Sequence, residues 1–333
     1  MTSALDIRID VSQATGLANS QIAASVFLPD PARIGDVPII LFAAPGGGYS
    51  RGYFDMHFAG REGYSEAQYH TERGFIYVTL DHLGVGGSTT EHLAVQRIEH
   101  MAAANDAAVR EIVARLEAGT LKPDFPAISQ PFVAGSGQSL GGGLTMIMQG
   151  RHRSYAAIVL LGISATHTVL PQPTPELARL TRSTYVFTRA TPNAELMERR
   201  AQKANPDYQY AYHYEDQPAD VVAADMSGGN PRRVTTPPFG SPTVPPCVMA
   251  CNSPHFFAAE ASQIDVPVLM AMGERDVCPE PLREPAAFDA ASDVSIFIVP
   301  GMAHMHNFAN TRARLWQRTH AWVRMVAEAA RVA

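Results

Sequence analysis

Cysteine, charged residues and long apolar runs are all scarce in this chain. Three cysteines in 333 residues are too few for a disulfide framework. Cys247 and Cys251 lack the second pair of ligands that a structural zinc ion needs, so the sequence predicts no metal site. No run approaches the roughly 20 apolar residues of a membrane-spanning helix. Residues 1–6 carry no basic segment followed by an apolar one, so we expect a cytoplasmic protein that makes no membrane contact.

Charge of either sign is also limited. Charged residues make up 17% of the chain and hydrophobic residues 46%, which is typical of a globular protein. The net charge is −6 and the lysines and arginines are scattered, so nucleic acid is not an expected partner. A chain of 333 residues is long for one domain, so we expect one domain that carries an insertion. The sequence leaves open whether the protein forms a homo-oligomer.

The chain does show a regular alternation of strand and helix patterns. Residues 5–28 alternate weakly and break at Gly16, which predicts an antiparallel hairpin. Apolar runs typical of strands buried on both faces cover 37–44, 75–80, 156–162, 266–272 and 294–299. Helical patterns cover about 60–72, the segment from a capping pair of Ser88 and Glu91 to Leu116, and the C-terminal segment. This alternation predicts a mostly parallel sheet with helices on both faces.

The alternation stops between residues 164 and 263. Prolines cluster at both ends of this segment, and between them lie two amphipathic stretches and an aromatic one at 208–214. A segment of roughly 100 residues without strand patterns, inserted in a strand–helix array, favours a lid over a loop. We therefore predict a core domain of residues 1–163 and 264–333 and a cap of residues 164–263.

A glycine-rich turn at residues 137–141 separates a strand pattern from a helix pattern. Its sequence, Gly-Gln-Ser-Leu-Gly, has the spacing of a nucleophile elbow. A strand that reverses into a helix within two residues strains the backbone of the residue at the turn. The residues two before and two after it must then be very small, or their side chains would clash. The turn would hold the Ser139 hydroxyl above the sheet, beside the N-terminus of a helix.

A serine hydroxyl needs a base within hydrogen-bond reach, and that base needs an orienting acid. In an open α/β sheet such groups lie just past the carboxyl ends of the strands. Asp276 follows the strand pattern of 266–272, and His304 follows that of 294–299. His306 is an alternative base and Glu274 an alternative acid. Asp276 could also be an ordinary turn aspartate.

The order of these residues resembles the α/β-hydrolase superfamily. Residues 137–141 match its nucleophile elbow, 273–276 resemble its acid turn, and 301–304 resemble its histidine loop. Residues 81–88 are similar to a glycine-rich turn that many members carry after an early strand. The resemblance covers about 20–163 and 264–330, and implies an α/β-hydrolase fold with a cap insertion.

Two N–H donors must already be in place for the oxyanion of an acyl-transfer reaction. One is expected to be the backbone N–H of Leu140, and the other that of Gly47 or Gly48. The loop that carries these glycines resembles the family's His-Gly-Gly-Gly loop, but Pro45 replaces the histidine and removes a side chain that could brace it. We expect the side chains of Tyr49, His82 and Gln138 to contact the substrate, although His82 could equally be a solvated turn residue.

These residues predict a serine hydrolase in which Ser139, His304 and Asp276 cleave a carboxylic ester or lactone through an acyl-enzyme. The chemistry requires no cofactor and no metal. The insert, rich in aromatic, methionine and proline residues, predicts an apolar roof over the pocket and hence a bulky, uncharged, apolar small-molecule substrate. Carbon–carbon bond hydrolases and cofactor-free perhydrolases use the same triad, so they remain alternatives. A non-catalytic binding protein on the same fold is a third hypothesis.

Overall fold

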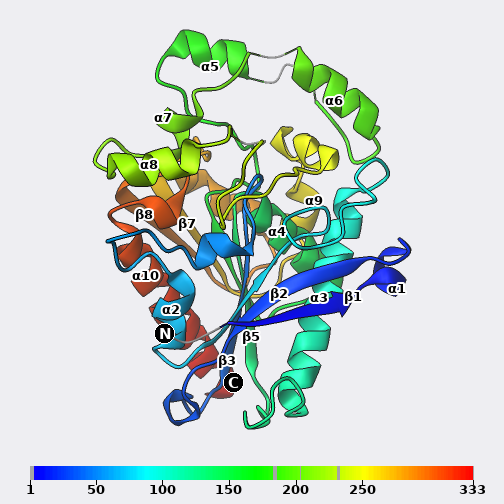
Figure 1. Ribbon diagram of the computed structural model, residues 1–333, viewed down its shortest axis with the longest axis vertical. Helices are drawn as coiled ribbons and strands as arrows, with labels where there is room; N and C mark the ends of the chain where they lie inside the picture. The colour runs from blue at the N-terminus through cyan, green and yellow to red at the C-terminus, as the bar shows by residue number, and fades with distance from the viewer. Residues whose placement is uncertain (1–3, 183–185, 203, 231–232, 333) are drawn as a thin grey trace.

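A twisted sheet lies at the centre of the molecule (Figure 1). The computed structural model describes residues 4–182, 186–202, 204–230 and 233–332. Within them the sheet has eight strands in the order β1-β2-β4-β3-β5-β6-β7-β8. The strands are β1 Leu5–Asp10, β2 Gln21–Phe27, β3 Ile39–Ala44, β4 Ile76–Leu80, β5 Phe132–Gln138, β6 Ala157–Leu161, β7 Val268–Arg275 and β8 Val294–Ala303. β1 pairs with β2 and β2 with β4 in antiparallel fashion, and the neighbours from β4 to β8 are parallel.

Both faces of the sheet are covered by helices, as the alternating sequence pattern predicts. The helices are α1 Ser12–Thr15, α2 Glu66–Thr71, α3 Ile98–Glu117, α4 Leu140–His152, α5 Pro175–Thr181, α6 Asn193–Ala201, α7 Tyr208–Tyr212, α8 Ala219–Met226, α9 Ala258–Ala261 and α10 Arg312–Val332. Side chains of α3, α4 and α9 form one apolar cluster with one face of the sheet. Side chains of α2 and α10 form a second cluster with the other face, in which Trp322 is buried. These two clusters hold the strand ends rigidly in place.

Two local predictions need correction. The helix expected near 60–72 is only α2, because the segment before Ser65 forms turns and isolated bridges instead. Ser88 and Glu91 are not a capping pair, since α3 begins at Ile98. The Ser88 hydroxyl instead donates to the carbonyl oxygen of Asp81 and accepts from the N–H of Ala23, which ties the turn to β2. A tertiary contact has displaced the local capping pattern.

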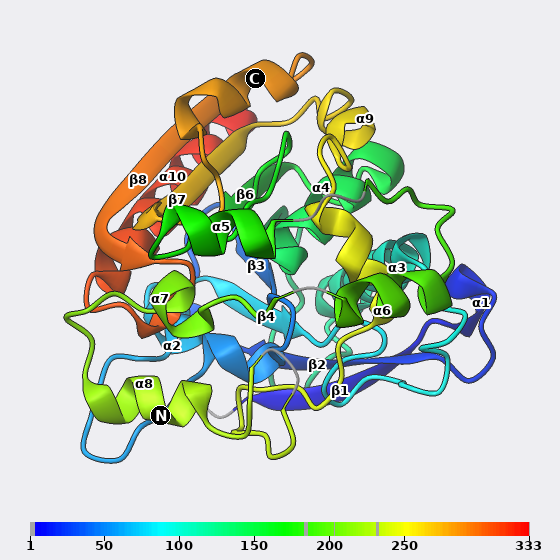
Figure 2. The same ribbon diagram turned by 90° about the horizontal axis from the view of Figure 1, so that it is seen from above.

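The segment 164–263 contains α5 to α9 and no strand among its described residues. Figure 2 looks onto the end of the molecule that carries α5 to α8, which lie above the sheet. The last part of this segment is nevertheless packed into the core, because Cys247, Cys251 and Phe257 belong to the apolar cluster of α3 and α4. The three cysteines are buried and free. The cap boundaries 164 and 263 stay a prediction.

The two longest helices do not have the character of membrane spans. α3 and α10 each present one apolar face to the sheet. Throughout the part of the chain that the structure describes, no helix combines the length and the apolar character needed to cross a bilayer.

Candidate active site

Ser139 occupies a strained turn between β5 and α4. Its backbone has φ 52° and ψ −117°, a conformation that a residue with a side chain rarely adopts. A Cβ at Gly137 would collide with the backbone of Gly141, and a Cβ at Gly141 would collide with the carbonyl of Ala44. The spacing of the two glycines is therefore a steric requirement of the turn. The structure confirms the elbow geometry that the sequence predicts.

Ser139, His304 and Asp276 are joined by hydrogen bonds. The Nε2 atom of His304 lies 3.0 Å from the Oγ atom of Ser139, and its Nδ1 atom lies 2.7 Å from Oδ1 of Asp276. A carboxylate can only accept here, so Nδ1 carries the proton and the lone pair of Nε2 faces the hydroxyl. The three side chains come from residues up to 165 positions apart and meet at the carboxyl ends of β5, β7 and β8. This geometry allows proton transfer from the serine to the imidazole.

Asp276 is held by four donors. The backbone N–H groups of Gly273 and Val277 donate to Oδ2 and Oδ1 at 2.8 and 2.7 Å. The imidazole of His306 donates from Nε2 to Oδ2 at 2.7 Å, beside the bond from His304. Burial raises the pKa of the Asp276 carboxyl, but attraction to the two imidazoles and their hydrogen bonds outweighs burial and holds this pKa well below its usual range. Asp276 therefore stays ionised across the ordinary pH range.

The alternative base and acid occupy other positions. His306 contacts the far oxygen of Asp276, and its buried Nδ1 atom has no hydrogen-bond partner. Glu274 accepts from the N–H of Gly301 at 2.9 Å and from the Tyr214 hydroxyl at 3.5 Å. Among the described residues, His304 is the histidine that bonds to Ser139, whereas His306 bonds to Asp276.

Gly162, at the end of β6, gives the two histidines their space. Its φ is +54°, and a Cβ there would lie 3.1 Å from Oδ1 of Asp276, from Nδ1 of His304 and from Nε2 of His306. Such contacts are tighter than normal van der Waals packing. A side chain at this position would therefore displace at least one member of the group.

The glycine loop after β3 lies against the nucleophile. A Cβ at Gly46 would come within 3.2 Å of the Cβ atom of Ser139, so the loop makes a close backbone approach there. Gly47 and Leu140 line the same cavity as Ser139. The first N–H groups of a helix have no partner within the helix, which leaves that of Leu140 free to bind an anion. Gly48 does not line the cavity, and its carbonyl accepts from the N–H of Ser241 at 3.0 Å.

His82 braces this loop from behind. Its Nε2 atom lies 2.8 Å from the carbonyl oxygen of Pro45, and Asn105 of α3 donates to its Nδ1 atom at 2.9 Å. Burial lowers the pKa of His82 and favours the neutral ring, and the Pro45 carbonyl, which can only accept, places the ring proton on Nε2. His82 is fully buried and is absent from the cavity lining. Its contacts in the structure are with the loop and with α3, so His82 supplies from another strand end the brace that Pro45 cannot.

Gln138 and Tyr49 also lie outside the cavity lining. The Gln138 side chain is buried and donates to the carbonyl oxygen of His304 at 2.9 Å, which ties the elbow to the histidine loop. Tyr49 is fully buried and donates its hydroxyl to Asp225 of α8. Both residues are next to a predicted site residue in sequence, but the contacts of their side chains are with Asp225 and with the histidine loop.

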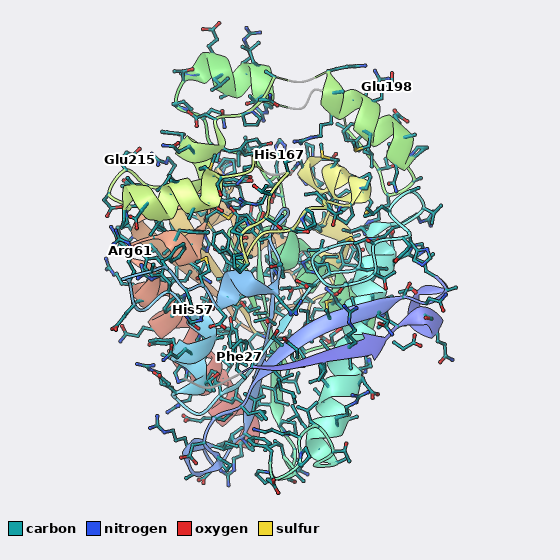
Figure 3. All side chains as sticks on the ribbon, in the orientation of Figure 1. Phe27, His57, Arg61, His167, Glu198 and Glu215 are labelled. Atoms are coloured by element: carbon teal, nitrogen blue, oxygen red, sulfur yellow. The ribbon has the colours of Figure 1, made fainter. Side chains whose placement is uncertain are left out.

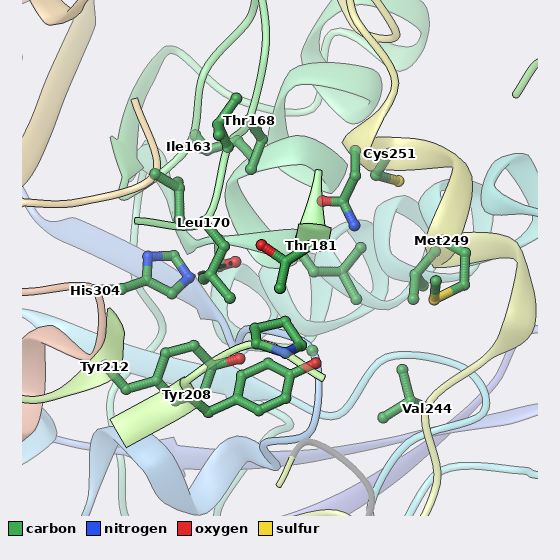
Figure 4. A pocket seen from close by; sticks show the side chains of 18 of the residues that line it. Ile163, Thr168, Leu170, Thr181, Tyr208, Tyr212, Val244, Met249, Cys251 and His304 are labelled. Carbon is green, nitrogen blue, oxygen red and sulfur yellow. Dashed lines mark hydrogen bonds between the residues drawn. The ribbon is translucent and has the colours of Figure 1, made fainter. Parts of the chain in front are cut away.

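A cavity of about 240 Å³ opens beside Ser139 and His304, which both line it. Figure 4 shows His304 on one side of this cavity and Met249 on the other, with Tyr208 and Tyr212 between them. Apolar lining comes from Ile163, Val169, Leu170, Val244, Val248, Met249, Val277 and Met305. In the described ranges, no group of three or more His, Cys, Asp or Glu side chains is arranged to hold a metal ion.

Solved structures show which fold this arrangement shares. A thermophilic esterase from Thermogutta terrifontis matches with a TM-score of 0.62 and 15% identity, over 97% of this chain and 100% of that one. A proline iminopeptidase from Mycobacterium smegmatis matches at 0.61 and 16%, over 98% and 100%. A haloalkane dehalogenase variant from Bradyrhizobium elkanii matches at 0.61 and 13%, over 99% of both chains. This chain has the α/β-hydrolase fold. No protein-family model matches the sequence, and neither does any curated protein.

The sequence-based prediction omits two residues that fix neighbours of the site, and it gives a different role to a third. Asn105 and Asp225 each fix a neighbouring group through a buried hydrogen bond, and His306, expected only as an alternative base, bonds to Asp276. Asn105 could have been found from the sequence, because it is a polar residue on the same helix face as the apolar residues of α3. No local signal pairs Asp225 with Tyr49, because 176 positions separate them.

Proposed function

We propose that this protein is a serine hydrolase that cleaves a carboxylic ester or a lactone. The observation that carries the proposal is the line of hydrogen bonds from Ser139 through His304 to Asp276, of which Ser139 and His304 line a cavity. Ionised Asp276 orients the imidazole and stabilises its protonated form. The neighbouring esterase structure supports this assignment only as a likeness of fold.

The reaction proceeds in two halves. The Oγ atom of Ser139 attacks the carbonyl carbon while Nε2 of His304 takes the hydroxyl proton. The oxygen of the tetrahedral intermediate accepts from the N–H groups of Leu140 and Gly47, which are positioned before the charge develops. The C–O bond then breaks and the leaving alkoxide takes the proton from His304. A water molecule, deprotonated by the same imidazole, releases the acid from the acyl-enzyme.

The lining of the cavity favours a substrate whose acyl or alcohol group is large and partly apolar. Its walls combine methionine, valine, leucine and tyrosine side chains contributed by the core and by the segment 164–263. Such walls bind by burial of apolar surface and tolerate a range of shapes. Carbon–carbon bond cleavage uses the same catalytic groups, so a vinylogous diketone belongs in the substrate set beside the esters.

Ser139→Ala tests the proposal. We expect this variant to fold normally, to lose labelling by a fluorophosphonate probe, and to lose several orders of magnitude of turnover on p-nitrophenyl esters. Ser136→Ala is the matched control, because Ser136 lies three residues earlier on β5 and its buried hydroxyl has no hydrogen-bond partner. Turnover of an ester series by Ser139→Ala at the wild-type rate would overturn the assignment. If the protein cleaved the diketone but none of the esters, the assigned reaction would be carbon–carbon bond hydrolysis instead of ester hydrolysis.

A further inference from the structure

The part of the cavity lining that comes from the segment 164–263 includes polar and cationic side chains. Arg200 of α6 and Arg182, directly after α5, both line the cavity, together with His167, Asn205 and Asn252. Among the described residues that line the cavity, none is Asp or Glu. The chain as a whole carries a net charge of −6, so this lining differs in sign from the average of the molecule. A site of this kind attracts anions and repels cations.

Arg200 has only weak partners within the protein. Its Nη1 atom lies 3.7 Å from the sulfur of Met249, and its Nη2 atom lies 3.5 Å from the Tyr208 hydroxyl. Both contacts are long for a guanidinium, whose five donors match a carboxylate in pairs. No described carboxylate forms an ion pair with Arg200. By contrast, Arg189 and Arg233 in the same insert each pair with a carboxylate at 2.7 to 2.8 Å.

The nearest acidic residue along α6 does not serve the cavity. Glu198 is exposed, and Figure 3 shows it on the outer side of α6. Because residues two apart on a helix point in different directions, Glu198 and Arg200 lie on different faces. The positive charge of Arg200 therefore remains available to a bound molecule.

A row of aromatic rings connects the catalytic base with Arg200. The ring of Tyr212 lies 5.6 Å from that of His304, and the ring of Tyr208 lies 5.4 Å from that of Tyr212. The Tyr208 hydroxyl then reaches Arg200. A molecule whose carbonyl lies at Ser139 would follow these rings with an apolar spacer before it meets the guanidinium. The row thus sets a minimum length between the scissile bond and any charged group.

We propose that the substrate is an acidic ester, with a carboxylate separated from the scissile carbonyl by an apolar spacer and bound by Arg200. This inference rests on the proposed hydrolase function, and it names a charged substrate class where the composition of the insert alone predicts an uncharged one. Arg182 adds a second positive charge to the cavity lining. An ionic contact remote from the reacting atoms is made equally in the ground state and the transition state, so it acts on KM more than on kcat.

Matched ester pairs test the proposal. The acyl-side pair is mono-p-nitrophenyl suberate and its methyl ester, and the alcohol-side pair is the butanoate of 6-hydroxyhexanoic acid and its methyl ester. For at least one pair we expect the wild-type protein to favour the acid by about tenfold or more in kcat/KM, mainly through KM. High salt should reduce this preference. Equal rates within both pairs would overturn the proposal.

Variants of Arg200 locate the effect. Arg200→Gln is expected to lose the preference for the acid, and Arg200→Lys to keep part of it, because an ammonium retains the charge without the paired donors. Arg179→Gln is the charge-matched control, since Arg179 of α5 is exposed and does not line the cavity. Persistence of the preference in Arg200→Gln, or its loss in Arg179→Gln, would contradict the assignment to Arg200.

A binding measurement separates this proposal from the hydrolase function. Calorimetric titration with sebacate and with its uncharged diamide needs no turnover. Binding of sebacate that is tighter than that of the diamide in the wild type, and lost in Arg200→Gln, supports the anion site even if no ester is cleaved. If neutral esters were cleaved in a Ser139-dependent way but sebacate bound no more tightly than its diamide, the anion site would be overturned. The proposed hydrolase function would still hold.

Discussion

Asp225 on α8 and Asp276 after β7 are two carboxylates buried to almost the same extent, with side chains 0% and 1% exposed. Each lies 2.7 to 2.8 Å from a histidine nitrogen. Their other partners differ. Asp225 is also bound by the guanidinium of Arg233 and by the Tyr49 hydroxyl. Asp276 is bound instead by two backbone N–H groups and a second imidazole, as described above.

The second nitrogen of each histidine decides what the carboxylate does. The Nδ1 atom of His213, the partner of Asp225, lies 2.7 Å from the side-chain oxygen of Gln217, inside the protein. The Nε2 atom of His304, the partner of Asp276, meets a hydroxyl that lines a cavity. An aspartate–histidine pair is therefore a structural link when both ends are enclosed, and a candidate for catalysis when one end reaches a reactive group.

The Asp225 group links three parts of the chain. Tyr49 follows the glycine loop after β3, His213 follows α7, and Arg233 donates also to the backbone carbonyl of Asp225. This group ties the segment 164–263 to the loop that carries Gly47. Its energetic role is to stabilise that connection, because its members are enclosed and none lines the cavity.

The largest expected effect comes from Asp276→Asn. The amide cannot hold the imidazole in the required tautomer or stabilise its cation, so we expect kcat on a p-nitrophenyl ester to fall by about a thousand- to ten-thousandfold. Circular dichroism should show an intact fold. If kcat fell by less than about tenfold, Asp276 would have a structural role like that of Asp225.

Asp225→Asn should show the opposite pattern. The change leaves the charge of Arg233 buried without its counter-ion, so we expect the free energy of unfolding to fall by about 3 to 5 kcal/mol. Urea denaturation followed by circular dichroism measures this quantity. Below the unfolding transition, kcat should remain within a few-fold of wild type. Loss of turnover without loss of stability would contradict the structural role.

His306→Phe sharpens the comparison inside the catalytic group. Removal of one donor makes the Asp276 carboxylate more basic, so it stabilises the protonated form of His304 more strongly. We expect kcat/KM to fall by about three- to tenfold, because the Asp276 carboxylate loses one of the donors that hold it in place. We also expect the acid limb of the pH profile of kcat/KM to move to higher pH. Asp276 itself stays ionised over the range of such a profile, because its pKa is held well below the usual range.

His57→Gln is the control for this experiment, since the His57 side chain is 64% exposed and its hydrogen bond is to Asp55. It should leave the pH profile unchanged. An unshifted acid limb in His306→Phe would show that His306 only fills space.

The smallest effect is expected from Tyr49→Phe. Burial and the charge of Asp225 raise the pKa of Tyr49 well above its usual value, so its hydroxyl is a neutral donor at every ordinary pH. Loss of this one hydrogen bond should lower the free energy of unfolding by about 1 kcal/mol. KM should stay within twofold of wild type for esters of all chain lengths. If the KM of Tyr49→Phe rose steeply with the chain length of the ester, this would indicate that Tyr49 contacts the substrate.

The sequence alone determined those features of this protein that depend on local sterics and burial. The glycines at 137 and 141 are required by a turn that leaves no room for a Cβ, and the apolar runs become strands because both faces are covered. The positions of Asp276 and His304 followed from the rule that functional side chains lie past strand ends. Each of these inferences needs only a few consecutive residues.

Only the tertiary structure decided which side chains meet. His304 and His306 lie two positions apart on one loop, and the path of that loop directs one to Ser139 and the other to the far side of Asp276. Likewise, Tyr49 lies next to the glycine loop in sequence but points to α8, and His82 replaces the missing brace of Pro45 from a different strand. Contacts between distant residues depend on how whole elements pack, because a side chain's direction is set by its backbone and its partner is set by the fold.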